Sequence, residues 1–192
     1  MSDSDDLVGF EPDRIVETLI EHRVDFVLVG GAAAQFHGAQ RLTQDADVVV
    51  EYGRENLICL CNALQELNWR LRVEGLSDTE SLAIRGATAL HPEVFERSMI
   101  QTFMTDAGSI DVLRVIPTAT GEHPGRPYEA LNAEATRHQI LPGLVVKLAS
   151  LDHIIESKQW ANRPKDQEAL PELVRLKRKQ EIGVNSDDDP GS

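Results

Sequence analysis

The chain has 192 residues, of which 41% are hydrophobic and 27% charged, and its formal net charge is -13. These values are ordinary for a globular domain and exclude a fibrous or a wholly disordered protein. No apolar run approaches the ~20 residues that span a bilayer. The acidic start MSDSDDLVGF also differs from the basic and then apolar start of a secretory signal. We therefore expect a cytoplasmic protein with one main domain and no membrane partner.

The negative charge is concentrated at the two ends of the chain. Residues 1–10 and 181–192 hold acidic side chains but no Lys or Arg. Because the ends are also poor in apolar residues, we expect residues 1–10 and the tail 183–192 to be disordered. Residues 163–180, in contrast, carry six basic and three acidic side chains. This run indicates either an ordinary solvated helix face or a local basic surface for a nucleic acid.

The cysteines and histidines indicate no soft-metal or disulfide chemistry. Cys59 and Cys61 lie two residues apart in a helical pattern, so their side chains point in different directions. We expect both to be reduced and structural. The six histidines form no pair at the i, i+4 spacing of a helical metal site, so we do not expect zinc.

Apolar periodicity and Gly or Pro positions define the elements of the first half. Pro12 stands near the start of an amphipathic pattern, and Gly38 is placed to end a short helix in the left-handed conformation. The predicted elements are helix 12–22, strand 26–29, helix 32–37, strand 45–50, helix 54–67 and strand 69–73. Residues 75–98 give no clear pattern.

The second half continues the alternation. We expect strands 99–104 and 109–115, a loop 117–127, helix 128–135, a strand 138–147 interrupted by Pro142 and Gly143, and helices 150–161 and 164–180. Pro171 either kinks the last helix or starts a separate piece. Alternating elements of this kind predict an α/β or α+β fold in which helices cover a mixed sheet.

The strand 45–50 begins with the sequence Asp-Ala-Asp. Asp45 and Asp47 are at positions i and i+2, so both carboxylates leave the same face of the strand. Two close anions repel, and hard oxygen ligands of this kind suit Mg²⁺ or Mn²⁺. The alternative is that one acid caps the loop and the other forms a salt bridge with Arg41.

Gly30 and Gly31 end the first strand before a short helix. Glycines at such a turn allow backbone amides to approach phosphate oxygens, and the helix dipole favours an anion there. The polar link that follows carries Arg41 and Thr43 and leads to the acid pair. The sequence thus predicts adjacent phosphate and metal sites, whereas a plain tight turn is the alternative for the glycines alone.

The segment VGGAAAQFHGAQRLTQDADVVV resembles the signature of the DNA polymerase β-like nucleotidyltransferase superfamily. The resemblance implies a third carboxylate on a later, neighbouring strand, and Asp111 in GSIDVLRV matches that expectation. An exposed strand position after a turn is the alternative for this acid. The segment ASLDHIIESKQWANRPKDQEAL resembles AbiEii/MenT-type toxins, in which a helix with a lysine precedes Arg-x-Lys-Asp. The chain departs from these toxins at the glycine turn. Many AbiEii-type members have Gly-Ser there, whereas Ala32 follows Gly31 in this sequence.

The resemblance implies a fold and a site. Residues 11–148 would form a nucleotidyltransferase core, and helices in 149–182 would complete the active site. Asp45 and Asp47 would bridge two Mg²⁺ (or Mn²⁺) ions, with Asp111 as a further ligand or as the base. The groups expected at the nucleotide are Gly30, Gly31, Arg41, Thr43, Lys158, Arg163 and Lys165. Asp166 would orient Lys158 or Lys165, or form a purely structural salt bridge.

The implied activity is transfer of a nucleoside monophosphate from an NTP with release of pyrophosphate. For the toxin branch the acceptor is the 3′ end of tRNA and the nucleotide a pyrimidine, which blocks aminoacylation, and an antitoxin protein is the expected partner. One alternative is modification of a protein hydroxyl or a small molecule such as an aminoglycoside. A non-catalytic binding module on the same fold is the other.

Overall fold

The computed structural model describes residues 10–71, 89–96, 98–120 and 125–186. The helices are α1 (Pro12–Glu21), α2 (Gly30–Phe36), α3 (Arg54–Glu66), the 3-10 helix η1 (Pro92–Glu96), α5 (Tyr128–Ala133), α6 (Leu151–Ala161) and α7 (Pro164–Ser186). The strands are β1 (Phe26–Val29), β2 (Asp45–Val50), β3 (Arg70–Leu71), β4 (Ile100–Thr105), β5 (Gly108–Leu113), β6 (Val115–Ile116), β7 (Arg126–Pro127), β8 (Thr136–Leu141) and β9 (Leu144–Leu148).

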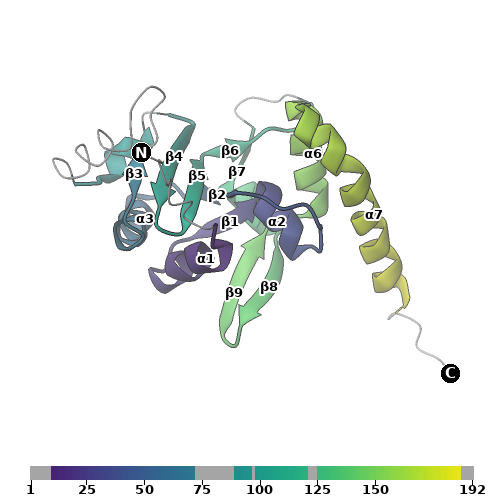
Figure 1. Ribbon diagram of the computed structural model, residues 1–192, viewed down its shortest axis with the longest axis horizontal. Coiled ribbons are helices and arrows are strands. Elements are labelled where there is room, and N and C mark those ends of the chain that lie inside the picture. The colour runs from purple at the N-terminus through teal and green to yellow at the C-terminus, as the bar shows by residue number, and fades with distance from the viewer. Residues whose placement is uncertain (1–9, 72–88, 97, 121–124, 187–192) are drawn as a thin grey trace, which may run out of the picture.

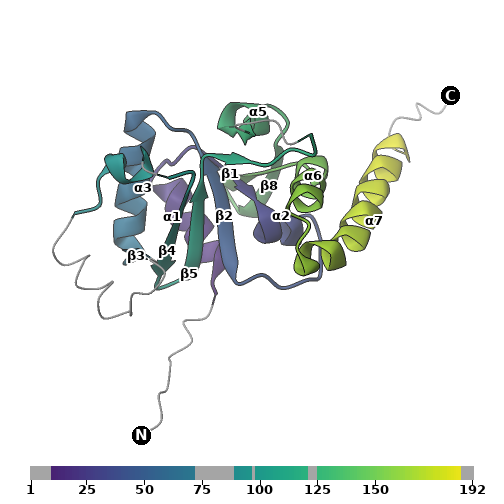
Figure 2. The same cartoon turned by 90° about the horizontal axis from the view of Figure 1, so that it is seen from above.

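A mixed seven-stranded sheet with the order β3-β4-β5-β2-β1-β9-β8 forms the centre of the molecule (Figure 1). β2 is antiparallel to β1 and parallel to β5, and β1 is parallel to β9. Helices α1 and α3 lie on one face of the sheet, and α2 and α6 lie on the other (Figure 2). This arrangement confirms the predicted mixed sheet covered by helices.

The core explains why the acids of β2 lie where they do. Ala46, Val48 and Val50 alternate along β2 and are buried, whereas Asp45 and Asp47 occupy the intervening positions and are only partly buried. Because side chains alternate across a strand, the apolar set fixes the face on which both carboxylates emerge. β1 is buried along its whole length, which suits a central strand.

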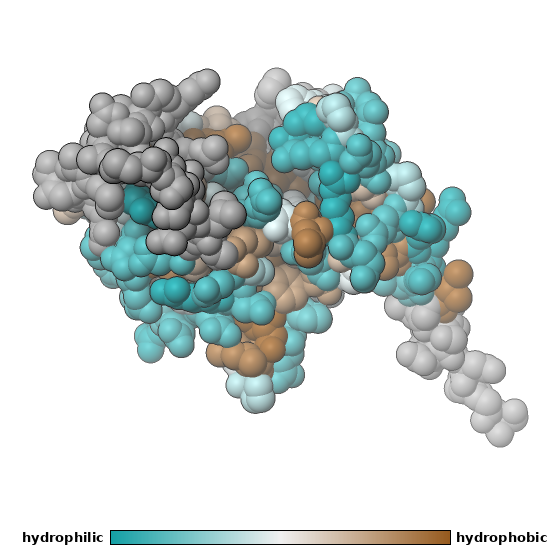
Figure 3. Space-filling model, in the orientation of Figure 1, coloured by the Kyte–Doolittle hydropathy of each residue, from teal (hydrophilic) through white to brown (hydrophobic). Residues whose placement is uncertain are grey.

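The predicted single strand 138–147 is wrong. The chain instead forms a hairpin in which β8 pairs antiparallel with β9, and Pro142 and Gly143 make the turn. Gly143 has φ +86°, a conformation that glycine adopts without strain. Figure 3 shows apolar side chains gathered over this hairpin, where Leu141 and Val145 are nearly half exposed.

The predicted strand 109–115 is also divided. β5 ends at Leu113, and Val115–Ile116 form β6, which pairs with β7 inside the segment that we expected to be a loop. The long helix 164–180 extends further than predicted, to Ser186, so residues 183–186 belong to α7 and not to the tail. Pro171 lies inside α7 and does not start a separate piece.

The two ends of α2 differ in how closely they follow the sequence pattern. Gly38 follows α2 with φ +100°, as predicted for a helix end, but α2 begins at Gly30, so both glycines form its first turn. Cys59 and Cys61 are unpaired. Within the described ranges, no helix has the length and apolar character needed to cross a membrane.

Candidate active site

Three carboxylates converge from two neighbouring parallel strands. Asp47 on β2 is directly opposite Asp111 on β5 in the sheet register, and Asp45 precedes Asp47 by two residues. One carboxylate oxygen from each of Asp45, Asp47 and Asp111 lies within 4.8 Å of the others. The sequence-predicted third acid therefore reaches the same place as the Asp-Ala-Asp pair.

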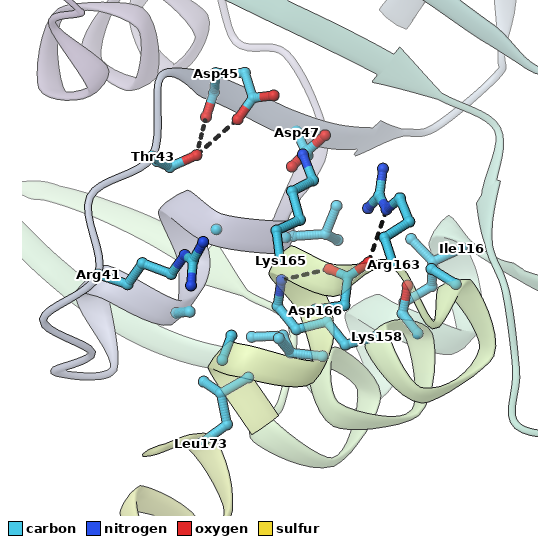
Figure 4. A pocket seen from close by; sticks show the side chains of 18 of the residues that line it. Arg41, Thr43, Asp45, Asp47, Ile116, Lys158, Arg163, Lys165, Asp166 and Leu173 are labelled. Atoms are coloured by element: carbon cyan, nitrogen blue, oxygen red, sulfur yellow. Dashed lines mark hydrogen bonds and ion pairs between the residues drawn. The ribbon is translucent and has the colours of Figure 1, made fainter. Parts of the chain in front are cut away.

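The glycines of α2 make room for this cluster. A Cβ on Gly30 would lie 2.0 Å from Oδ2 of Asp47, and a Cβ on Gly31 would lie 2.7 Å from Oγ1 of Thr43. Thr43 donates a hydrogen bond to Oδ1 of Asp45 over 2.6 Å, which orients that carboxylate (Figure 4). The first turn of α2, the link before β2 and the acids thus form one packed unit.

The opposite side of the site carries positive charges from the junction of α6 and α7. We call Lys158, Arg163 and Lys165 the cationic wall. Asp166 is fully buried and accepts hydrogen bonds from Lys158 Nζ (3.2 Å) and Arg163 Nε (2.7 Å). Burial opposes ionisation of Asp166, but the hydrogen bonds from Arg163 and Lys158 outweigh it and lower the pKa of this carboxyl. Of the two predicted lysine partners, Lys158 is the one that Asp166 contacts.

The acids and the cations influence each other electrostatically. Burial, together with the charges of Asp45 and Asp111, raises the pKa of Asp47 to about 7, against the opposing effect of Lys158 and Lys165. Figure 4 shows Lys165 directed at Asp47 from α7. The acids remain mutually repulsive despite these lysines, which is the state expected of carboxylates arranged for a cation.

Arg41 does not pair with Asp45 or Asp47, so the alternative salt bridge fails. Its guanidinium donates to Oε2 of Glu168 on α7 over 2.8 Å, and both side chains are about half exposed or more. The backbone amide of the neighbouring Gln40 donates to Glu172 over 2.8 Å. Two glutamates of α7 therefore fasten the link between α2 and β2.

One cleft of about 620 Å³ is lined by the three carboxylates, the glycines of α2 and the cations from α6 and α7. Its lining includes every residue that the sequence analysis predicted for the site: Gly30, Gly31, Arg41, Thr43, Asp45, Asp47, Asp111, Lys158, Arg163, Lys165 and Asp166. The sequence reasoning missed an apolar part of the lining, to which Leu42, Ile100 and Trp160 contribute. For Trp160 a signal existed, since this aromatic residue stands between Lys158 and Arg163 in a polar stretch.

The residues present fit a divalent cation. The donor set of Asp45, Asp47 and Asp111 consists of carboxylate oxygens, which are the hard ligands that Mg²⁺ and Mn²⁺ prefer. Within the described part of the chain, this is also the one group of metal-type ligands close enough to share an ion. Burial is the main cause of the raised pKa of Asp47, and an ion there would relieve the repulsion from Asp45 and Asp111 that adds to it.

Comparison with solved structures identifies the fold. A crystal structure of ANT(2'')-Ia in complex with adenylyl-2''-tobramycin is similar with a TM-score of 0.52, 15% sequence identity and coverage of 90% of both chains. The chain therefore has a nucleotidyltransferase fold. A solution structure of the antibiotic-resistance factor ANT(2'')-Ia has a TM-score of 0.47 and 14% identity, with coverage of 91% of this chain and 93% of that one.

The sequence comparisons add no family. No protein-family model matches the chain, and no curated protein matches it. At 15% identity the likeness to ANT(2'')-Ia concerns the nucleotidyltransferase fold. The roles of the individual residues and the narrower AbiEii/MenT-type resemblance stay predictions.

Proposed function

We propose that this protein transfers a nucleoside monophosphate from an NTP to an acceptor hydroxyl in a divalent-metal-dependent reaction that releases pyrophosphate. The observation that carries the proposal is the convergence of three carboxylates opposite a cationic wall in one cleft. A nucleoside triphosphate bound with its metal ion requires both features, because the metal needs anionic ligands and the phosphates need positive partners.

Asp45, Asp47 and Asp111 would hold Mg²⁺ (or Mn²⁺), and the bound ion would neutralise charge at the triphosphate and lower the pKa of the acceptor hydroxyl. Lys158, Arg163 and Lys165 would bind the phosphate oxygens from the opposite wall. Gly30 and Gly31 allow the phosphates to approach the first amides of α2.

Asp166 would keep Lys158 and Arg163 in place, since its buried carboxylate contacts both cations. With this support the two side chains are positioned before the nucleotide arrives. Arg41 is paired with Glu168 and would have to leave this acid in order to bind the triphosphate.

The direct test is a transfer assay with each labelled NTP, Mg²⁺ and a candidate acceptor. The double variant Asp45→Asn, Asp47→Asn should lose transfer and Mg²⁺-dependent NTP binding, as measured by calorimetry. The matched control is Glu129→Gln, which removes an exposed carboxylate on α5 and should leave both activities unchanged. Mg²⁺-dependent NTP binding that persists in the double variant would refute the assignment.

For the acceptor we propose the 3′ end of tRNA, with a pyrimidine nucleotide and a toxin role that a cognate antitoxin would restrain. Two observations support this choice: the AbiEii/MenT-type resemblance of the Lys158 to Asp166 segment, and the exposed basic side chains along α7. The exposed basic residues are Lys165, Arg175, Arg178 and Lys179. Basic side chains next to a catalytic cleft attract the phosphate backbone of RNA.

The second candidate acceptor is an aminoglycoside or another cationic small molecule. It is favoured by the likeness to ANT(2'')-Ia, whose crystal structure contains adenylyl-2''-tobramycin. The net charge of -13 also attracts cations. Parallel assays with total tRNA and with tobramycin separate the two candidates, because label on RNA supports the first and label on the small molecule supports the second.

A further inference from the structure

The cleft has an aromatic group that the proposed metal and phosphate sites do not use. Trp160, on the last turn of α6, lines the cleft and is 50% exposed. Tryptophan side chains are highly buried on average, so the Trp160 ring leaves an unusually large share of its surface exposed. Among the residues that line the cleft, Trp160 is the aromatic one.

The second tryptophan of the chain shows the contrast. Trp69 is 3% exposed and packs edge-on against Phe103, with 6.0 Å between the ring centroids. Within the described ranges, the ring-to-ring contacts involve Trp69, Phe36, Phe95, Phe103 and His138, and none involves Trp160. The faces of the Trp160 ring are therefore not used for packing against another aromatic side chain.

Trp160 lines the same cleft as the positive charges. It follows Lys158 by two residues and precedes Arg163 by three, and all three line the same cleft. An NTP has a charged triphosphate at one end and a planar base with apolar faces at the other. A cleft that combines Lys158 and Arg163 with an exposed indole offers partners for both ends of one such molecule.

We propose that the base of the bound nucleotide stacks on the indole ring of Trp160, which would make this residue the base-binding element of the nucleotide site. The inference rests on the proposed function, because it assumes that an NTP occupies the cleft. Stacking on an aromatic ring tolerates any base and strengthens binding by about tenfold or more. Trp160 thus contributes affinity for the nucleoside part and none for the triphosphate.

The test compares Mg·ATP with Mg·tripolyphosphate, which has the same phosphate chain and no base. Binding of each ligand is measured by calorimetry and by tryptophan fluorescence in the wild-type protein. Mg·ATP should quench the emission of the exposed Trp160, whereas Mg·tripolyphosphate should bind with little quenching. The emission of Trp69 should not respond, since that ring is buried outside the cleft lining.

Variants then separate the base from the phosphates. Trp160→Leu should weaken Mg·ATP binding by about tenfold or more and leave Mg·tripolyphosphate binding unchanged, while Trp160→Phe should keep most of the affinity for Mg·ATP. Ile182→Ala is the matched control, because Ile182 is a 70% exposed apolar residue on α7 that does not line the cleft.

The outcomes distinguish the two levels of the proposal. If Trp160→Leu binds Mg·ATP as tightly as the wild-type protein, the stacking inference is wrong and the proposed function stands. Equal weakening of Mg·ATP and Mg·tripolyphosphate would also overturn it, because that result assigns Trp160 to the shape of the cleft. If the wild-type protein binds neither ligand with Mg²⁺, the proposed function fails, and the stacking inference fails with it.

Discussion

Gly30 and Asp47 occupy space that cannot hold one more carbon atom, since a Cβ on Gly30 would lie 2.0 Å from Oδ2 of Asp47. The backbone of Gly30 is also in the left-handed region, with φ +64°. The first turn of α2 and the central carboxylate of the cluster are therefore positioned by each other. A side chain at residue 30 must displace the carboxylate, the helix start or both.

Gly30→Ala should abolish nucleotide transfer and lower stability by about 1–3 kcal/mol, because the methyl group displaces Asp47 and strains a positive φ. Calorimetric binding of Mg·NTP and thermal unfolding measure the two effects. The matched control is Gly143→Ala in the β8–β9 turn, where φ is +86° but no atom lies within 4 Å of the added Cβ. That variant should lose only about 1 kcal/mol and keep full activity. Equal activity of the two variants would contradict the role of the Gly30 contact.

Asp47→Asn should stabilise the metal-free protein at pH 8. Burial and the neighbouring acids raise the pKa of Asp47 from its ordinary value of 3.8 to about 7, so the folded state resists ionisation of this group. The resulting penalty is absent below pH ~4, grows between pH ~4 and ~7, and is constant above that range. The gain from the substitution should reach up to about 4 kcal/mol at pH 8 and vanish near pH 4.

Thermal unfolding in EDTA at several pH values measures the effect of Asp47→Asn. Adding Mg²⁺ provides the control, because the ion should stabilise the wild-type protein and leave the variant nearly unaffected. A variant that is less stable than the wild-type protein at pH 8 without metal would show that Asp47 has a structural role instead.

Asp166→Asn should destabilise the protein by about 1–3 kcal/mol at neutral pH, because a buried carboxylate that accepts from Lys158 and Arg163 loses its charge. Although burial opposes ionisation, the contacts lower the pKa of Asp166 below its ordinary value. Their contribution is therefore present above pH ~4 and disappears as the pH falls through the lowered pKa. The stability difference between wild type and variant should shrink accordingly in acid.

A kinetic measurement decides whether Asp166 positions the cations or only stabilises the fold. If it positions Lys158 and Arg163, Asp166→Asn should raise KM for the NTP at a temperature where the variant is fully folded. Lys158→Gln should give a similar rise. An unchanged KM in folded Asp166→Asn would leave the residue with a structural role alone.

Arg41→Ala should raise KM for the NTP by about tenfold if the guanidinium leaves Glu168 for the triphosphate, as the sequence predicts. Stability should change by less than about 1 kcal/mol, because the Arg41–Glu168 pair is exposed to solvent. Glu168→Gln serves as the control, since it frees Arg41 without removing it and should not raise KM. If both substitutions change KM to the same extent, the pair only fastens the link between α2 and β2.

The local sequence was sufficient to predict a feature wherever that feature depends on one helix or one strand alone. The alternation of Asp45, Ala46 and Asp47 placed both acids on one face, and the buried run of β1 placed the glycines at its end. The hairpin at 138–147 was missed, because Pro142 and Gly143 look alike whether they interrupt one strand or join two. Only pairing with a partner strand settles that choice.

The periodicity and turn residues of single elements did not predict side-chain contacts between segments that are distant in the sequence. Glu168 was one acid in a mixed run, and its pairing with Arg41 across 127 positions depends on where α7 docks. Trp160 was visible as an aromatic residue among polar ones, yet its half-exposed position in the cleft depends on where α6 lies in the folded chain.

By itself, the sequence predicted adjacent metal and phosphate sites, because carboxylate spacing on a strand and glycines after a strand are local geometric constraints, and the activity followed from the resemblance to the nucleotidyltransferase superfamily. Only the tertiary structure decided that Asp111 lies directly opposite Asp47 in the sheet, that Asp166 contacts Lys158 and Arg163 and not Lys165, and that Gly30 has no room for a side chain. The physical reason is that these relations depend on sheet register and helix docking, which the packing of the whole core fixes.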